Sequence, residues 1–207
     1  IVGNVAKIAP QHQSLEAPTE LRELQGWLCW KSEWLDGEAK PRKTPYYADG
    51  GRRHGKQGSP EDRSKLVTFA AAKASAARRG MDGVGLALMP EFGITALDFD
   101  RCVDADGNLP SEIAQIVGRT YSEFSPSGNG VRAFVRGDYG NRKSSGNGDF
   151  GFETFHSSGY CTFTGNILPI VDIVGFEDTV AGDEVTASRV RALCEKRFGQ
   201  AEPKIPD

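Results

Sequence analysis

The chain has 207 residues, 38% of them hydrophobic, and is therefore long and apolar enough to bury the core of one domain. Its 25 glycines and 11 prolines are too few for a disordered or collagen-like chain, and no apolar run approaches the roughly 20 residues of a membrane span. The formal net charge of −3 lacks the basic excess typical of nucleic-acid binders, so a nucleic-acid partner would have to be held by a local patch.

Caps and helical periodicity predict helices, and β-branched or aromatic runs predict strands. In chain order these are helix 19–25, strand 27–30, helix 67–79, strands 84–89 and 93–100, helix 112–119, strands 120–124, 131–136, 150–155 and 160–164, and helix 187–198. We expect strands 84–89 and 93–100 to form a hairpin around Pro90. The order predicts an α+β fold with a mainly antiparallel sheet.

The ends of the chain and its cysteines give coarser expectations. Residues 1–18 are predicted to be a flexible arm, 19–200 a single domain of two lobes, and 201–207 the start of a linker within a longer protein. The first ten residues lack the features of a signal peptide. The four cysteines have no zinc-knuckle spacing and are expected to be free thiols in a cytoplasmic protein.

Basic side chains gather between positions 40 and 56, where only Asp49 opposes them. Such a segment can follow a phosphate backbone, although a solvated loop would show the same pattern. The candidate nucleic-acid-binding residues are Lys40, Arg42, Lys43, Arg52 and Arg53. Trp27 and Trp30, just before this segment, are expected in the core rather than on a stacking surface.

Two aspartates, Asp98 and Asp100, end an apolar strand. A period of two places both side chains on one face, about 7 Å apart. Like charges at that separation raise each other's pKa unless a cation lies between them, so the pair favours a hard divalent ion such as Mg²⁺ or Mn²⁺. Alternatively, Asp98 and Asp100 only form the turn at the end of the strand and bind no metal ion.

The polar run 104–108 resembles the start of a calcium-binding loop. Gln115 stands where that loop needs an acid, so we expect a polar turn.

Glycines at 128 and 130 form a predicted tight turn between two strands. Its backbone amides could bind an anion. Alternation along the second strand sets Arg132 beside the turn, either facing a triphosphate or simply facing solvent. A third acid, Glu153, stands among aromatics on a later strand, where an unpaired charge would be costly; a strand-edge ion pair with an arginine is its alternative role.

In this order the motifs resemble the archaeo-eukaryotic primase superfamily, in particular the primase-polymerase domains of phages and plasmids. The resemblance extends roughly over 27–165. It rests on Trp27–Trp30, Lys40–Tyr46, Asp82–Leu86, Leu97–Asp100, Ser125–Gly130, Phe152–Phe155 and Thr162–Gly165. It implies a catalytic lobe similar to an RNA-recognition motif, with an N-terminal α/β lobe beside it.

The resemblance also implies the site residues. In the family, two aspartates and a third acid hold two divalent ions, Mg²⁺ or Mn²⁺, and these roles carry over to Asp98, Asp100 and Glu153. The triphosphate of the incoming nucleotide would be held by Ser125, Ser127, Gly128, Asn129, Gly130 and Arg132.

Two departures from the family pattern concern the phosphates. Arg132 stands where the family usually has histidine; arginine still pairs with phosphate but does not deliver a proton to pyrophosphate as histidine would. An arginine that often precedes the last motif is absent, with Gly159 near its place. His156 could replace the missing imidazole, although alternation puts it on the face opposite Glu153.

The expected function is template-directed nucleotidyl transfer: a primase and DNA polymerase that makes or extends primers in phage or plasmid replication. Its partners would be single-stranded DNA template, primer, and NTPs or dNTPs. The linker-like tail suggests a longer replication protein with a fused or associated helicase. Two alternatives remain open, a non-catalytic origin or single-strand-binding module with a primase-like fold, and a metal-dependent phosphohydrolase or nuclease that uses the same carboxylates.

Overall fold

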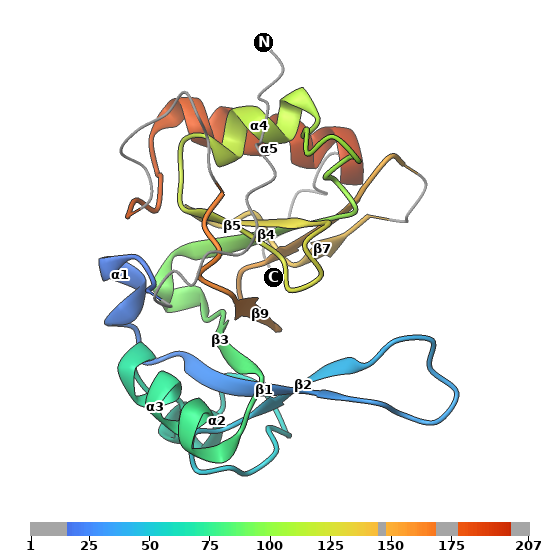
Figure 1. Ribbon diagram of the computed structural model, residues 1–207. Helices are drawn as coiled ribbons and strands as arrows, with labels where there is room; N and C mark the ends of the chain where they lie inside the picture. The colour runs from blue at the N-terminus through green and yellow to red at the C-terminus, as the bar shows by residue number, and fades with distance from the viewer. Residues whose placement is uncertain (1–15, 145–147, 169–177, 200–207) are drawn as a thin grey trace.

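The computed structural model describes residues 16–144, 148–168 and 178–199. Two antiparallel sheets lie one above the other, with helices above the upper sheet and helices beside and below the lower one (Figure 1). Most of the predicted arm and the whole predicted linker start fall outside the described residues. Ala17, at the end of the arm, is buried in the core.

The four-stranded sheet contains the early strands and one late strand. Its order is β2 (Arg42–Tyr46), β1 (Trp27–Glu33), β3 (Gly83–Ala87) and β9 (Tyr160–Phe163). The helices of this half are α1 (Thr19–Arg22), α2 (Pro60–Lys65) and α3 (Phe69–Arg79). Trp27, Phe69 and Phe163 meet edge to face in its core, at centroid distances of 4.7–5.8 Å. Trp27 and Trp30 are both buried, as predicted.

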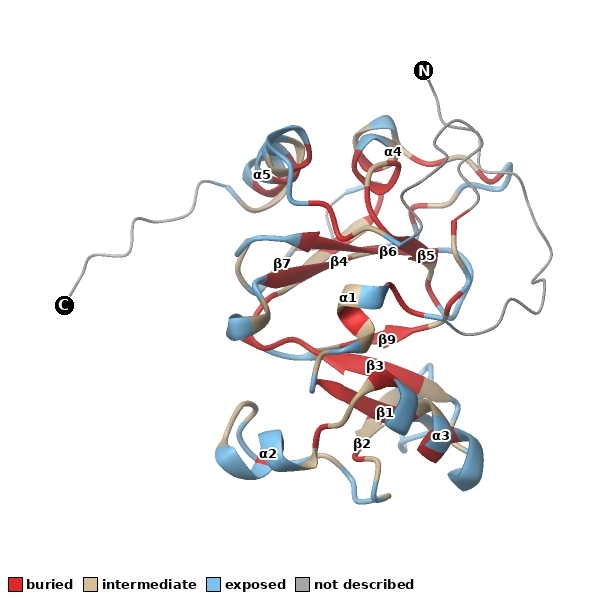
Figure 2. Ribbon diagram, turned by 90° about the vertical axis from the view of Figure 1, so that its left-hand side faces the viewer, coloured by how far each residue is buried: buried red, intermediate tan, exposed pale blue. Residues whose placement is uncertain are grey.

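The five-stranded sheet carries most of the predicted motifs. Its order is β5 (Ser122–Phe124), β6 (Val131–Arg136), β4 (Ile94–Asp100), β8 (Gly151–Phe155) and β7 (Arg142–Lys143). Helices α4 (Ser111–Val117) and α5 (Glu184–Phe198) lie on one side of it, above the strands in Figures 1 and 2. Leu97, Phe99 and Val131 pack into the core under these helices. The opposite face of the sheet is turned toward the four-stranded sheet.

A second core joins the two sheets. Ile94, Ala96 and Phe134 of the five-stranded sheet share it with Cys29 and Phe163 of the four-stranded sheet. In Figure 2 the buried strands of both sheets face each other across this layer. The two halves are therefore packed directly together, which fixes where the inner face of the five-stranded sheet meets β9.

The predicted α+β class with antiparallel sheets is confirmed, and every predicted helix and strand is present with ends that differ by at most three residues. The hairpin around Pro90 is wrong. The 3₁₀ turn Pro90–Phe92 and Gly93, at φ +62°, lead the chain out of one sheet and into the other. Each strand then lies between two other partners, β3 between β1 and β9, and β4 between β6 and β8. In a hairpin, β3 and β4 would pair with each other, and each strand would have only one edge left for another strand. In the structure both edges of each strand pair with other strands.

Besides the short strand β7, two elements were not predicted. The basic segment contains strand β2, which pairs with β1 from Cys29–Tyr46 to Glu33–Arg42, so this part of it is not a loop. Helix α2 follows, with the Ser59 hydroxyl accepting a hydrogen bond from the Asp62 amide. All four cysteines are buried free thiols, as expected. In the described part of the chain, no helix has the length and apolar character needed to cross a bilayer.

Candidate active site

Five charged side chains, one from each strand, form a single row across the five-stranded sheet. In spatial order they are Glu123 on β5, Arg132 on β6, Asp98 on β4, Glu153 on β8 and Lys143 on β7; we call these five residues the charged row. Each is the direct cross-strand partner of the next. Directly opposed residues put their side chains on the same face of a sheet. Because the alternating neighbours pack under the helices, the charged row lies on the inner face.

Asp98 and Arg132 form the centre of the row. Arg132 Nε donates to Asp98 Oδ1 at 3.1 Å, and Nη1 donates to the Thr162 carbonyl oxygen at 3.0 Å and also contacts the Thr162 hydroxyl. Only 6% of Arg132 is exposed. Burial raises the pKa of Asp98, an effect that Arg132 opposes and the like charge of Asp100 reinforces. Arg132 is thus a fixed cation that ties Asp98 to strand β9.

Glu123 stands on the other side of Arg132 and is fully buried. Both its carboxylate oxygens accept from the Thr164 amide, at 2.9 and 3.0 Å, and Oε2 also accepts from the Gly165 amide and the Tyr121 hydroxyl, each at 2.9 Å. Burial raises the pKa of Glu123 to about 7. Sequence reasoning missed this residue. The signal was available: Glu123 lies within a predicted strand that leads into the glycine turn, and a charged side chain in a buried strand needs a partner.

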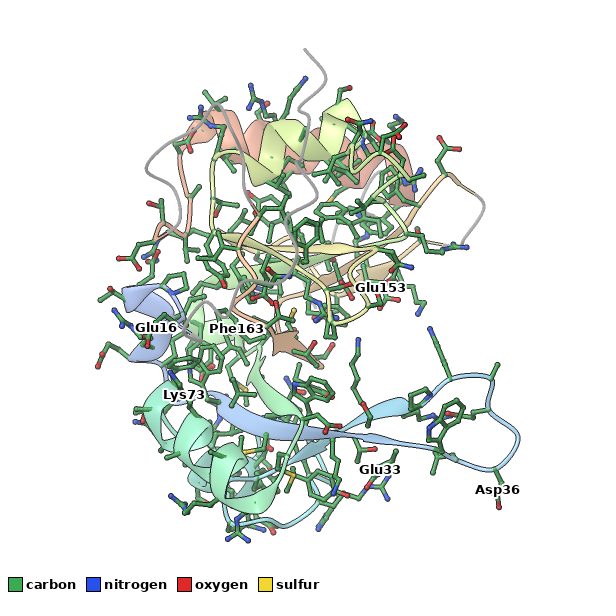
Figure 3. The ribbon with its side chains drawn as sticks, in the orientation of Figure 1. Glu16, Glu33, Asp36, Lys73, Glu153 and Phe163 are labelled. Carbon is green, nitrogen blue, oxygen red and sulfur yellow. The ribbon has the colours of Figure 1, made fainter. Side chains whose placement is uncertain are left out.

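Glu153 and Lys143 close the row at its outer end. Glu153 is the cross-strand partner of Asp98, and its Oε1 forms an ion pair with Lys143 Nζ. Figure 3 shows Glu153 on the lower side of the five-stranded sheet, the side on which β1 and β2 extend. The costly acid predicted on this strand therefore has a partner, but the partner is a lysine and not an arginine. Lys143 was not predicted.

Asp100 and the glycine turn lie together at the end of β4. The Ser125 amide donates to the Gly130 carbonyl oxygen at 2.8 Å, which closes the turn. A Cβ on Gly130 would lie 2.6 Å from the Phe99 carbonyl oxygen and 3.5 Å from Asp100 Cα, so only glycine allows this approach. Ser127, Gly128 and Asn129 are exposed at the tip of the turn. The structure thus brings the predicted triphosphate-binding turn beside the second aspartate.

The five predicted nucleic-acid-binding residues are dispersed. Lys43 lies near the charged row: burial lowers its pKa, the charge of Arg132 lowers it further, and Asp98 and Asp100 raise it. Arg53 is held inside the four-stranded half by two bonds of 2.8 Å to buried Asp62.

The other three basic residues lie at the surface. Arg42 pairs with Glu38 and Arg52 with Glu33, while Lys40 is exposed between the strands. Arg42 and Lys40 belong to the hairpin of β1 and β2, which extends away from the body of the molecule in Figure 1. The exposed basic surface is therefore smaller than the sequence suggested, because Arg53 is buried and Lys43 faces the carboxylates.

The three acids have the oxygen ligands that hard divalent ions prefer. Asp98 and Glu153 are directly opposed like charges, an arrangement that destabilises a sheet unless a cation compensates it. Among the described residues, however, no group of three or more His, Cys, Asp or Glu side chains is arranged to hold a metal ion. The carboxylate oxygens are suitable ligands for a divalent ion. In the structure their negative charges are balanced by Arg132, which pairs with Asp98, and by Lys143, which pairs with Glu153.

Two minor expectations concern residues outside this cluster. In the segment 104–108, Asp104 accepts hydrogen bonds from the Asp106 and Asn108 amides at 2.9 and 2.7 Å, so the expected polar turn is confirmed. His156 is buried, with Nδ1 3.1 Å from the Ile94 carbonyl oxygen and 3.3 Å from the Thr95 hydroxyl. Thr95 lies on the face of β4 opposite Asp98, so His156 does not join the charged row.

Comparison with known proteins gives one informative match. No protein-family model matches the chain. The DNA primase-polymerase of Nitratiruptor phage NrS-1 is 28% identical over 148 residues, which cover 69% of this chain and 19% of that protein. The matched region is therefore about a fifth of the relative's length. This similarity supports a relationship to primase-polymerases.

Proposed function

We propose that the chain is a template-directed nucleotidyltransferase of the primase-polymerase type. The observation that carries the proposal is the pair Asp98 and Glu153, two acids opposed across neighbouring strands, beside Asp100 and the glycine turn. The similarity to a phage DNA primase-polymerase supports it. The five-stranded sheet with its two helices would be the catalytic lobe, similar to an RNA-recognition motif, and the four-stranded half the N-terminal lobe.

Asp98, Asp100 and Glu153 would hold two Mg²⁺ or Mn²⁺ ions. Such ions, when bound, lower the pKa of the attacking hydroxyl and neutralise the leaving pyrophosphate. The protein's own part is to position these carboxylates. Arg132 does so for Asp98, because its bonds to Thr162 anchor the guanidinium to β9 and its Nε fixes one carboxylate oxygen.

The substrates would be a single-stranded DNA template, a primer, and NTPs or dNTPs. The exposed tip of the turn, Ser127 to Asn129, offers hydroxyl and amide groups to the phosphates of the nucleotide. Lys43, Lys40 and Arg42 would contact phosphates of nucleotide or template from the β1–β2 side. A helicase partner stays a prediction.

The experiment is primer synthesis and primer extension on single-stranded templates with labelled NTPs or dNTPs and Mg²⁺ or Mn²⁺. We expect product from the wild type and none from Asp98→Ala/Asp100→Ala. Asp106→Ala, which removes an exposed aspartate of the polar turn, should retain full activity. DNA affinity of the double variant should be equal or higher, because two negative charges are removed.

The same experiment separates the alternatives. Tight DNA binding by a folded wild type that makes no product would favour the non-catalytic binding module, whose support in the structure is the absence of a ready metal-holding group among the described residues. Metal-dependent cleavage of the template without synthesis would favour a nuclease. A collapse of DNA binding in the double variant would show that the carboxylates serve another role.

A further inference from the structure

Lys143 sits at the edge of the sheet beside all three acids. Its ammonium pairs with Glu153, whose hydrogen bond and charge raise the pKa of Lys143; Asp100 and Asp98 raise it further. Strand β7 has only two residues and pairs only with β8. Lys143 therefore supplies the positive charge next to the one pair of like charges in the charged row.

The two cations of the row are held very differently. The side chain of Arg132 is 7% exposed and is anchored on both Asp98 and Thr162. The side chain of Lys143 is 75% exposed and has the Glu153 carboxylate as its hydrogen-bonded partner. An exposed lysine pair of this kind is worth at most about 1 kcal/mol, so another cation can replace it at low cost. Arg132 is a permanent part of the site, whereas Lys143 is exchangeable.

We propose that Lys143 is an exchangeable counter-cation of Glu153: an entering divalent ion takes its place on the carboxylate, and the freed ammonium then binds the nucleotide's triphosphate. The inference rests on the proposed function. Charge balance supports it, because Glu153 keeps a cation before and after the exchange. A flexible four-carbon stem with a compact charge suits such a movement better than an arginine fork does.

The first test measures Mn²⁺ binding to the full chain in the absence of nucleotide and DNA, by electron paramagnetic resonance of free Mn²⁺. Lys143→Met keeps the aliphatic stem and should bind Mn²⁺ about two- to fivefold more tightly than the wild type. Lys196→Met is the matched control, because Lys196 of helix α5 forms a similarly exposed ion pair with Glu112 of helix α4. Its Mn²⁺ affinity should be unchanged.

Lys43→Met separates direct exchange from a general loss of positive charge. Lys43 also lies within electrostatic reach of Asp98 and Asp100, but the cation that pairs with Glu153 is Lys143. Its removal should tighten Mn²⁺ binding less than removal of Lys143. Equal effects of the two substitutions would overturn the exchange, as would an unchanged affinity in Lys143→Met.

The second test measures the affinity for a nucleoside triphosphate with Mg²⁺ and without DNA. Lys143→Met should bind the nucleotide about three- to tenfold more weakly, and Lys196→Met should match the wild type. Tighter Mn²⁺ binding with unaltered nucleotide affinity would overturn the triphosphate role. A wild type without Mn²⁺ binding would overturn both this inference and the metal site, whereas the expected binding changes in a protein that synthesises nothing would overturn only the polymerase function.

Discussion

The buried acid Glu123 should make the stability of the protein fall as the pH rises toward neutrality. Its carboxylate is fully buried, and burial raises its pKa from 4.5 to about 7. The informative substitution is Glu123→Gln, because the amide has nearly the same shape and one oxygen that can still accept from Tyr121 and Gly165. The glutamine, unlike the glutamate, has no proton to lose.

The sign and size of the effect follow from proton linkage. Below pH 4.5 the carboxyl is protonated in both the folded and the unfolded state. Between 4.5 and about 7 the unfolded chain loses the proton while the folded chain keeps it, so the free energy of unfolding decreases as pH rises. The difference between the two pKa values corresponds to about 3 kcal/mol, which is fully lost above pH 7.

The assay is urea unfolding of wild type and Glu123→Gln at a series of pH values from 4 to 8, with Glu112→Gln as the control for an acid in a surface ion pair. Taking the difference between proteins at each pH cancels every titration they share. We expect wild type to lose about 3 kcal/mol relative to Glu123→Gln across this range. Parallel curves would refute the raised pKa. A relative gain by the wild type would mean that its hydrogen bonds and Arg132 outweigh burial.

Two further substitutions test the packing around the site. Arg53→Met leaves Asp62 buried and without its paired charge, and should lower the free energy of unfolding by about 3 kcal/mol in a urea titration; a loss below about 1 kcal/mol would mean that Arg53 serves the surface instead. Gly85→Ala puts a Cβ 2.8 Å from the Tyr160 ring and 2.9 Å from the Cys161 carbonyl oxygen, so thermal unfolding should show a loss of about 2 kcal/mol. A variant as stable as the wild type would mean that β9 can shift freely away from β3.

The alternation of strands was predictable from the sequence, and with it much of the site. Period two placed Asp98 and Asp100 on one face, and set Arg132 opposite Val131 and Ala133, and both arrangements are present. Alternation is a property of single strands, so it requires no knowledge of the fold. Which strands pair, and in which register, depends instead on contacts between distant segments.

The strand pairings and Lys143, which the sequence analysis missed, show this limit. Nothing local relates Glu153 to Asp98, yet the pairing of β4 with β8 makes them direct neighbours. Lys143 lies on a strand of two residues, which is too short to carry a periodic signal. Strands β3 and β4 were predicted to pair because they are adjacent in sequence. The structure gives each of them two other partners, which no local pattern distinguishes.

The order of signs along the charged row bears on whether the site turns over substrate. Glu123, Arg132 and Asp98 alternate in sign, and the alternation breaks only where Asp98 meets Glu153. Such a break is unfavourable in a sheet, and a single neutral side chain in place of either acid would remove it. A module that only bound DNA would gain by that replacement, since negative charge repels the phosphate backbone. The presence of both acids beside an exchangeable lysine therefore favours a site that works with cations over one that only holds nucleic acid.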